Sequence, residues 1–370
     1  MKHIVVNASN LHLGGGLQVA CSFVSEIIDE LPLDKYQFSF MLSSKVLSNL
    51  IDIEFPSEIN IYEINSFGFK KPCSTYFTVI KSADVVFNVF GPVYYRNHLI
   101  KNVTGFAQAW IAYPNNEAYK LFGFFERYLE KMIFSLKKYF FFSFKDRYIV
   151  ESDHVKKALV NNLSINESDI SVVYNCISSL YLNHEVIFKS ILDSPKLIIG
   201  VMGRAYEHKN LRIIKELNDY LMEHCDFDVE FVFTLNDKEM KLLGFDSIDN
   251  MKSVGELKSN ECAKFYKKVD VLLFTSLLEC FSVTPLEGLA MKVPVIASDR
   301  DFVHDVCKEH VFYVDPNNIK DIAIMIENVK HDVDLGSRVE RGYEYVMGLP
   351  SASDRAKRYL KIVVEELENV

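Results

Sequence analysis

The sequence has no uncharged apolar run of about 18 or more residues, the length that a membrane-spanning helix requires. The apolar run near its beginning, Ile4–Val6, is too short for a signal peptide, and we expect a strand there. A basic excess is also missing: 41 Lys and Arg against 50 Asp and Glu give a net charge of -9, which argues against a nucleic-acid binder. The seven cysteines form no C-x-x-C pair, which speaks against a zinc site and fits a reducing compartment.

Two further motifs are missing or weak. No G-x-G-x-x-G sequence is present, so a dinucleotide site is not expected; instead, Gly14–Gly16 follow the first strand. These glycines form either a flexible turn or a place where backbone N–H groups approach an anion at a helix N-terminus. The triplets Asp226–Asp228 and Asp332–Asp334 match Asp-x-Asp, but one precedes a predicted strand and the other lies in a helical region, so we expect no metal there.

What is present fits a two-domain α/β protein. A length of 370 residues is too great for one ordinary core, and 49% apolar with 25% charged residues is typical of globular proteins. Short apolar runs alternate with helical segments, which predicts parallel sheets. The predicted strands are Ile4–Asn7, Tyr36–Leu42, Ile59–Ile64, Asp84–Phe90, Thr104–Gln108, Tyr148–Glu151, Ser171–Tyr174, Leu197–Met202, Phe231–Thr234, Val271–Phe274, Val293–Ile296 and Val311–Val314.

The chain is organised around the stretch Ser276–Ser298. One strand, Val271–Phe274, enters it, and another, Val293–Ile296, leaves it. Between them Thr284 is a predicted N-cap, with Pro285 at the first helical position. The loop and the helix N-terminus then lie at the carboxyl end of a strand, where open α/β sheets bind their ligands.

Charged residues at such strand ends have two readings. Glu279 is either an ordinary loop carboxylate or a site residue. Glu287 follows Thr284 by three positions, so it is either the acid of a capping box or a ligand-binding carboxylate. Arg204 and Lys209 bracket a helix start after the first strand of the second half, as surface charges or as groups that hold phosphates.

These residues together resemble a known signature. Two glutamates separated by seven residues, with the aromatic-small-aliphatic triplet Phe281–Val283 after the first and a small-residue helix after the second, resemble retaining nucleotide-sugar glycosyltransferases of the GT-B fold. More narrowly, the chain looks like a bacterial O-antigen or capsular polysaccharide glycosyltransferase of the group 1 type. The family often has glycine at the positions of Cys280, Ser282 and Lys292, and alanine at that of Gly288.

The resemblance implies an architecture. It implies two Rossmann-like domains whose parallel sheets face a central cleft. Residues 1–185 would form an acceptor-binding domain and residues 195–350 a nucleotide-sugar-binding domain, with a linker at 183–194. Residues 351–370 would form a C-terminal helix that crosses back to the N-terminal domain.

The resemblance also implies roles for single residues. Arg204 and Lys209 would hold the donor diphosphate, and Glu279 would stabilise the cation-like sugar ring, these three being the catalytic set. The family acceptor-side histidine is missing, and our hypothesis is that the acceptor pocket is lined by Gln108, Tyr113 and Asn115, although a buried aromatic cluster around Trp110 is the other reading. The donor-binding residues would be Glu287 on the ribose, Phe281, Ser282, Val283 and Thr284 on sugar or phosphate, Gly255 and Leu257 on the base, and Gly15 and Gly16 near the phosphates.

The segment Lys120–Arg147 mixes ten aromatic residues with lysines and arginines. Such helices can lie on anionic lipid headgroups; the other reading is a core-facing aromatic stripe with solvated lysines. Nearby, His154 follows a predicted cap, Ser152, and is expected at the surface. The resemblance favours the membrane reading, because such enzymes extend sugars carried on a polyprenyl diphosphate.

We therefore predict a retaining, metal-independent glycosyltransferase without a cofactor, at the cytoplasmic face of the bacterial inner membrane. It would move a sugar from a nucleoside-diphosphate sugar, a UDP-sugar being favoured over a GDP-sugar, to a lipid-linked glycan acceptor. Two alternatives stay open. One is a GT-B sugar-nucleotide epimerase, and the other is a non-catalytic partner in polysaccharide assembly.

Overall fold

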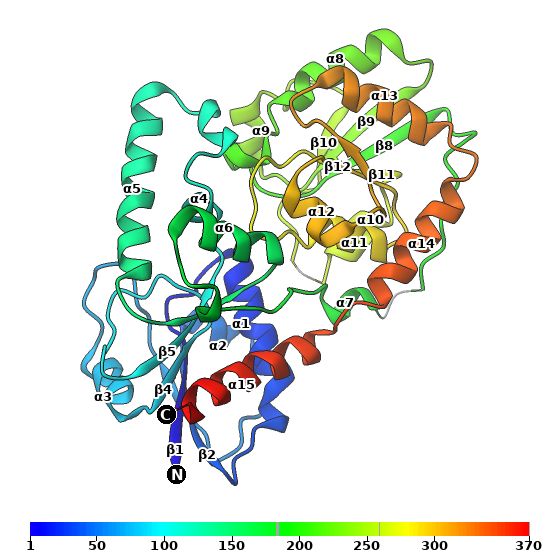
Figure 1. Cartoon of the computed structure of the whole chain (residues 1–370). Helices are drawn as coiled ribbons and strands as arrows, with labels where there is room; N and C mark the ends of the chain where they lie inside the picture. The colour runs from blue at the N-terminus through cyan, green and yellow to red at the C-terminus, as the bar shows by residue number, and fades with distance from the viewer. Residues whose placement is uncertain (183–184, 259, 370) are drawn as a thin grey trace. The chain divides into compact units, whose positions relative to one another are not determined.

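The computed structural model describes residues 1–182, 185–258 and 260–369. Its contacts divide the chain into two units (Figure 1). The first holds Met1–Pro114, Tyr128–Asn175 and the C-terminal stretch from Pro350, and the second holds Asn115–Arg127 and Cys176–Leu349. The division after Asn175 precedes the linker expected at 183–194, of which Asn183 and His184 lie outside the described residues.

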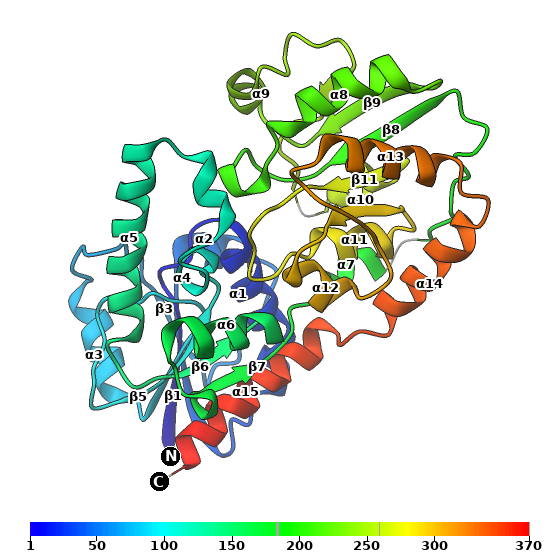
Figure 2. The same cartoon turned by 45° about the horizontal axis from the view of Figure 1, so that its top comes forward.

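The first unit is built on a parallel sheet of seven strands (Figure 2). Their order is β3-β2-β1-β4-β5-β6-β7, so the chain winds outward from β1 in both directions and the switch point lies between β1 and β4. The strands are β1 (Lys2–Ala8), β2 (Tyr36–Leu42), β3 (Asn60–Glu63), β4 (Val85–Asn88), β5 (Lys101–Phe106), β6 (Arg147–Val150) and β7 (Ile170–Val172). The helices are α1 (Gly14–Ile27), α2 (Ser44–Ser48), α3 (Ser74–Ser82), α4 (Ala109–Ala112), α5 (Phe124–Phe142, from Tyr128 on in this unit), α6 (Asp153–Leu163) and α15 (Ala352–Glu368).

Strand β5 differs from the sequence prediction. It was expected at Thr104–Gln108, but it begins at Lys101 and ends at Phe106. The prediction missed the start of the strand because Lys101 and Asn102 are polar. Lys101 is stabilised there by the C-terminal helix, since its Nζ donates to the Glu366 carbonyl at 3.0 Å. As a result, Gln108 stands at the N-cap position of α4.

Helix α15 belongs to the core of the first unit. Its capping box joins Ser351 and Asp354, and its apolar face includes Tyr359 and Val363 in the same buried cluster as Phe23 of α1. The ring of Tyr359 lies 5.9 Å from that of Phe23. Burial of this face fixes the last helix of the chain onto the N-terminal sheet.

The second unit is built on a parallel sheet of six strands, in the order β10-β9-β8-β11-β12-β13. Its switch point lies between β8 and β11. The strands are β8 (Lys196–Val201), β9 (Asp228–Phe233), β10 (Met251–Ser253), β11 (Val271–Phe274), β12 (Val295–Ser298) and β13 (Phe312–Val314). The helices are α7 (Ser179–Leu182), α8 (Ile213–His224), α9 (Asp237–Leu243), α10 (Cys262–Tyr266), α11 (Thr284–Ala290), α12 (Asp301–Cys307), α13 (Ile319–Lys330) and α14 (Leu335–Met347).

Both faces of the second sheet are covered, which explains its continuous apolar strands. Along β11, Val271 and Leu273 enter the core formed with α8 and α13, whereas Leu272 and Phe274 enter the core formed with α10, α11 and α12. Helix α10 is short and begins at Cys262, and Ser259 before it lies outside the described residues.

The departure from the family pattern at Gly288 has a packing reason. A Cβ there would lie 2.8 Å from Leu272 Cδ2 and 2.8 Å from Val295 Cγ2, which is too close without a shift of those side chains. Helix α11 therefore packs on β11 and β12 at the distance that glycine allows.

Candidate active site

The charged candidates of the second unit lie at the carboxyl edge of its sheet. Arg204 and Lys209 follow β8, and Glu279 and Glu287 follow β11. These two strands are neighbours and flank the switch point of the sheet. Ligands of open α/β sheets bind at such points. The side chains themselves form separate clusters, Arg204 with Glu239 and Glu256, Lys209 with Glu279, and Glu287 with Tyr266.

Arg204 is held by two carboxylates that sequence reasoning did not single out. Its Nη1 lies 2.5 Å from Glu256 Oε1, and its Nε lies 3.1 Å from Glu239 Oε1. Glu239 also accepts from the Ala205 N–H at 3.0 Å and completes the capping box of α9 with Asn236. The Asn-x-x-Glu spacing of that box was a readable signal for the position of Glu239.

Lys209 forms the least exposed ion pair of this edge with Glu279. The Lys209 Nζ lies 2.5 Å from Glu279 Oε1, and the two side chains are only 16% and 15% exposed. Ser276 Oγ donates to the same oxygen at 3.2 Å. The shared burial strengthens the attraction relative to a surface pair, because water screens it less.

His208 sits beside this pair, with its Nε2 3.9 Å from Glu279 Oε1. Burial lowers the pKa of His208, against the opposing effect of the Glu279 carboxylate. The imidazole is therefore neutral at pH 7, and the positive charge of this cluster resides on Lys209. Main-chain bonds fix the neighbourhood: the Leu277 N–H donates to the His208 carbonyl at 2.7 Å, and Thr275 Oγ1 donates to the Lys209 carbonyl at 3.0 Å.

The helix after Glu279 starts differently from the prediction. Thr284 was expected as the N-cap, but it is the first residue of α11, and Val283 takes the cap position without a side-chain hydrogen bond. Pro285 is accordingly the second helical residue and not the first. Phe281, Ser282 and Val283 precede the helix with half-buried side chains. The prediction placed the cap at Thr284, one residue after the observed cap Val283, because a valine side chain has no oxygen that could accept a capping hydrogen bond.

Glu287 does not act as a capping acid. Its Oε2 accepts a hydrogen bond from the Tyr266 hydroxyl at 2.8 Å, and its side chain is also hydrogen-bonded to Tyr181. Burial raises the pKa of Glu287, and the bonds from the two phenols act in the opposite direction. Its side chain is half-buried, and the capping-box reading is wrong.

The segment predicted to touch the base follows β10. Gly255 has a positive φ of 78°, which favours glycine, and its N–H donates to Ser253 Oγ at 3.0 Å. Leu257 packs against the core that contains Phe281 and Leu286. The Glu256 carboxylate between Gly255 and Leu257 is the one that binds Arg204.

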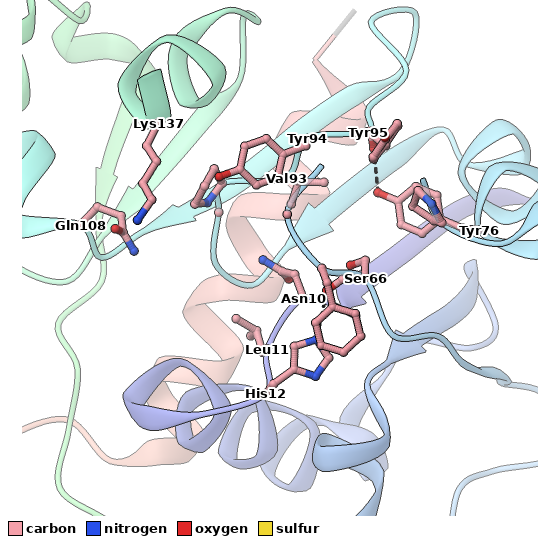
Figure 3. A pocket seen from close by; sticks show the side chains of 15 residues that line it. Asn10, Leu11, His12, Ser66, Tyr76, Val93, Tyr94, Tyr95, Gln108 and Lys137 are labelled. Carbon is pink, nitrogen blue, oxygen red and sulfur yellow. Dashed lines mark hydrogen bonds between the residues drawn. The ribbon is translucent and has the colours of Figure 1, made fainter. Parts of the chain in front are cut away.

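The first unit has a cavity of about 400 Å³ at the carboxyl ends of its central strands. It is lined by side chains that follow β1, β3, β4 and β5, with Lys137 added from α5 (Figure 3). In Figure 3, Lys137 points toward Gln108, and Tyr76 donates to the Tyr95 carbonyl at 2.7 Å. His12 stacks on Phe67 with ring centroids 4.2 Å apart. Aromatic surfaces beside a few polar groups are typical of ligand pockets.

The predicted acceptor residues do not all line this cavity. Gln108 does, but Tyr113 and Asn115 are not among its lining residues. Tyr113 stacks on His154 with ring centroids 6.0 Å apart, and Asn115 belongs to the second unit. His154, expected at the surface, is half-buried by this stacking. Gly15 and Gly16 form the first turn of α1, after the positive φ of 69° at Gly14.

The α5 helix exposes an apolar stripe. Phe141 of this helix is buried, and the rings of Phe140 and Phe142 also pack on the first unit, so the core-facing reading holds for one face of the helix only. The helix holds to its unit through contacts such as the stacking of Phe134 on Trp110, at 5.6 Å between centroids. We call the exposed side chains the α5 stripe: Tyr128, Leu129, Met132, Ile133, Leu136 and Tyr139.

Among residues 1–182, 185–258 and 260–369, no helix has the length and apolarity needed to cross a membrane. In the same residues, no group of three or more His, Cys, Asp or Glu side chains is arranged to hold a metal ion.

Known proteins resemble this chain in sequence. Residues 183–342 match the family model described as glycosyl transferases group 1. The O-antigen chain mannosyltransferase RfbU of Salmonella typhimurium is 23% identical over 314 residues, which cover 83% of this chain and 73% of that protein.

Solved structures resemble the whole chain. A glycosyltransferase from Rickettsia africae matches with a TM-score of 0.70 at 18% identity, covering 100% of both chains. Anabaena HepE in complex with UDP-glucose matches with a TM-score of 0.67 at 11% identity, covering 99% of this chain and 100% of that one. The two units thus have the predicted GT-B fold of these glycosyltransferases, and the second unit carries the match to the glycosyl transferases group 1.

Proposed function

We propose that this glycosyltransferase moves a sugar, with retention of anomeric configuration, from a nucleoside-diphosphate sugar to a lipid-linked glycan acceptor in bacterial surface-polysaccharide synthesis. The observation that carries the proposal is the half-buried Lys209–Glu279 pair at the switch point of the second sheet, with Arg204 on the same β8 loop as Lys209. A polysaccharide role is supported by the resemblance to the Salmonella O-antigen mannosyltransferase. A UDP-sugar donor is supported by the likeness to Anabaena HepE with its UDP-glucose.

The two cations would neutralise the departing diphosphate. Arg204 offers a planar fork that fits phosphate oxygens, and Lys209 offers a compact charge. Both are now paired with carboxylates, so the diphosphate would displace or share these partners on binding. Fixed cations in a site with little water stabilise developing negative charge without reorganisation, and no metal ion is needed in this scheme.

The sugar would react beside Glu279. As the bond from C1 to the phosphate oxygen breaks, the ring gains positive charge, which the Glu279 carboxylate stabilises. The acceptor hydroxyl oxygen bonds to C1 on the same face, and its proton passes to the departing phosphate oxygen. Backbone N–H groups of Phe281, Ser282 and Val283 would hold the sugar or the phosphates.

The rest of the donor would be held by groups with other chemistry. Glu287 would accept hydrogen bonds from the ribose hydroxyls, and the chain near Gly255 and Leu257 would contact the base. Gly15 and Gly16, in the first turn of α1, would contribute N–H groups that have no partner within the helix.

The acceptor would enter the cavity of the first unit. Gln108 supplies an amide that can bind sugar hydroxyls, and Lys137 supplies a cation suited to a phosphate. Stacked rings such as His12 on Phe67 offer flat apolar surface to a sugar face. Tyr113 and Asn115 remain part of the proposed acceptor set, although they do not line the cavity.

A membrane surface would present such an acceptor. The α5 stripe is apolar and aromatic, and Lys131 and Lys138 lie on the same helix. Helices of this kind bind anionic bilayers through apolar burial and charge attraction. We place the enzyme at the cytoplasmic face of the inner membrane. Flotation with anionic and neutral liposomes tests this placement. We expect the wild-type chain to bind only the anionic liposomes and the double variant Lys131→Glu/Leu136→Ser to lose this binding. Equal binding to both kinds of liposome would contradict the placement.

Donor turnover is the test of the reaction. The full chain is incubated with UDP- and GDP-sugars, with and without lipid-linked glycan, in EDTA. The proposal expects sugar transfer to the glycan, with the anomeric configuration of the product matching that of the donor. Turnover without acceptor would indicate an epimerase or hydrolase, strict dependence on Mg²⁺ or Mn²⁺ would remove the metal-free scheme, and no turnover or binding would indicate an assembly partner.

A further inference from the structure

A polar cluster of the second unit surrounds Glu287, and its other members have no role in the scheme so far. It joins the Glu287 carboxylate to the phenols of Tyr181 and Tyr266 and, through Tyr181, to the Cys262 thiol. Tyr266 is fully buried on α10, and Tyr181 is 3% exposed on α7. Their rings meet edge to face at 6.0 Å between centroids.

The two phenols occupy only part of the hydrogen-bond acceptor positions of the Glu287 carboxylate. The shortest contact of the Tyr266 hydroxyl is the one to Glu287 Oε2 at 2.8 Å, compared with 3.4 Å to the Thr284 carbonyl. An ionised carboxylate has about four acceptor positions, so two phenols leave roughly two for further donors. Two neighbouring ribose hydroxyls would use those two positions.

Tyr181 comes from a different part of the chain. The chain leaves the first unit after Asn175, and Tyr181 follows six residues later on the segment that connects the units. Ile177 and Tyr181 are buried in the same core as Leu286 of α11 and Phe281 of the loop. The connecting segment is therefore anchored, within the second unit, against the helix that carries Glu287.

We propose that Tyr181 and Tyr266 are positioning residues that hold Glu287 in the orientation in which it binds the donor ribose, and that Tyr181 ties this carboxylate to the connecting segment. The proposal rests on the proposed function, since it assumes that Glu287 binds the ribose. A buried carboxylate with only one fixed bond can rotate, whereas two phenols from two elements fix its plane. Their hydrogen bonds also keep the carboxylate ionised, and therefore able to accept from hydroxyl groups, despite its desolvation.

The test compares nucleotides that differ by one hydroxyl. Dissociation constants of UDP and 2′-deoxy-UDP, and of GDP and 2′-deoxy-GDP, are measured by calorimetry on the full chain and on Tyr266→Phe, Tyr181→Phe and Glu287→Gln. The control is Tyr345→Phe, whose hydroxyl donates to the Val306 carbonyl at 2.7 Å in the same unit. The competent fraction scales both dissociation constants equally and cancels in their ratio, so the ribose preference of a partly unfolded variant can still be read.

The expected result is a loss of ribose discrimination. The wild type and the control favour the ribonucleotide by about tenfold or more, the usual effect of a hydrogen bond to a charged group. Glu287→Gln removes most of this preference, and each Tyr→Phe variant reduces it at least about threefold while leaving the affinity for the 2′-deoxy nucleotide nearly unchanged.

The outcomes separate the two proposals. If Glu287→Gln abolishes the preference and both Tyr→Phe variants keep it, the tyrosines do not position the carboxylate and the inference is overturned. If the wild type has no preference, or binds neither pair, the role of Glu287 in the proposed function fails and the inference fails with it. The pH dependence gives a second readout. The groups that face Glu287 are Tyr181, Tyr266 and the nearby Cys262. Because loss of the Tyr266 phenol raises the pKa of Glu287, the ribonucleotide affinity of Tyr266→Phe should begin to fall at a higher pH than that of the wild type as the solution is acidified.

Discussion

The switch point between β1 and β4 in the first unit opens into a cavity walled by aromatic and neutral polar side chains, with Lys137 as its cation. The switch point between β8 and β11 in the second unit is instead surrounded by ion pairs, with Lys209 on Glu279 as the most buried. The two sheets share parallel, doubly wound topology. The difference therefore lies in the loops, which supply the chemistry on a common frame.

This contrast matches the two substrates of a sugar transfer. A nucleoside diphosphate carries concentrated negative charge, which calls for cations, whereas a glycan offers hydroxyls and flat apolar faces, which call for aromatic rings and amides. Charge removed from the second unit is expected to affect turnover, and contacts removed from the first unit are expected to affect acceptor affinity.

The largest effect is expected for Lys209→Ala. It removes the half-buried cation and leaves Glu279 without its cationic partner, so kcat should fall about 10²–10³-fold, as for loss of one charge-stabilising group. Steady-state turnover at saturating acceptor measures this. Lys196→Ala is the matched control, because Lys196 pairs with Glu230 at the start of β8, the opposite end of that strand. A kcat within twofold of wild type for Lys209→Ala would contradict the assignment.

Arg204→Ala is expected to cost about 10² in kcat. The smaller loss follows from the greater exposure of Arg204, whose side chain is 36% accessible, because water screens its charge. Arg204→Lys should recover only part of the activity, since lysine keeps the charge without the planar fork. Equal activity of the lysine and wild-type enzymes would show that the fork is not used.

Gln108→Ala is expected to raise the KM for the acceptor about 2–10-fold, the usual range for one neutral hydrogen bond. The donor affinity should not change, because the side chain lies in the cavity of the first unit. Initial rates over a grid of donor and acceptor concentrations separate the two constants. If Gln108→Ala changes only the donor affinity, the assignment of the acceptor to the first unit and the donor to the second is contradicted.

The pH dependence is expected to be modest and one-sided. Burial raises the pKa of Glu287 above its usual 4.5, so nucleotide affinity should fall as pH drops toward that raised value and the carboxylate becomes protonated. His208 has a lowered pKa and stays neutral near pH 7, so it should add no inflection between pH 7 and 8. Nucleotide affinity measured from pH 4.5 to 8 tests both expectations. If the loss of affinity at low pH persists in Glu287→Gln, a group other than Glu287 causes it.

Much of this architecture is readable from the sequence. Strand β11, for example, was predicted at its observed bounds, because sheets covered on both faces leave continuous apolar runs. The placement of Arg204, Lys209, Glu279 and Glu287 after neighbouring strands follows from the same pattern.

The contacts of these residues are less readable. Glu256 pairs with Arg204, and Tyr266 donates to Glu287, each from a different part of the chain. Such partners are brought together by tertiary packing, so the spacing of residues in the sequence does not predict them. The start of β5 at Lys101 was missed because a charged residue at a strand end looks like a loop until its partner on α15 is known. The stacking of His154 on Tyr113 likewise joins segments that are distant in sequence.

The central claim is that the charged edge of the second unit binds the nucleoside diphosphate. The most direct measurement is calorimetric titration of UDP and GDP into the wild-type chain, Lys209→Ala and Gln108→Ala. The account predicts that one of the two nucleotides binds the wild type, that Lys209→Ala weakens this binding about tenfold or more, and that Gln108→Ala leaves it unchanged. Binding that survives in Lys209→Ala and is lost in Gln108→Ala would contradict it.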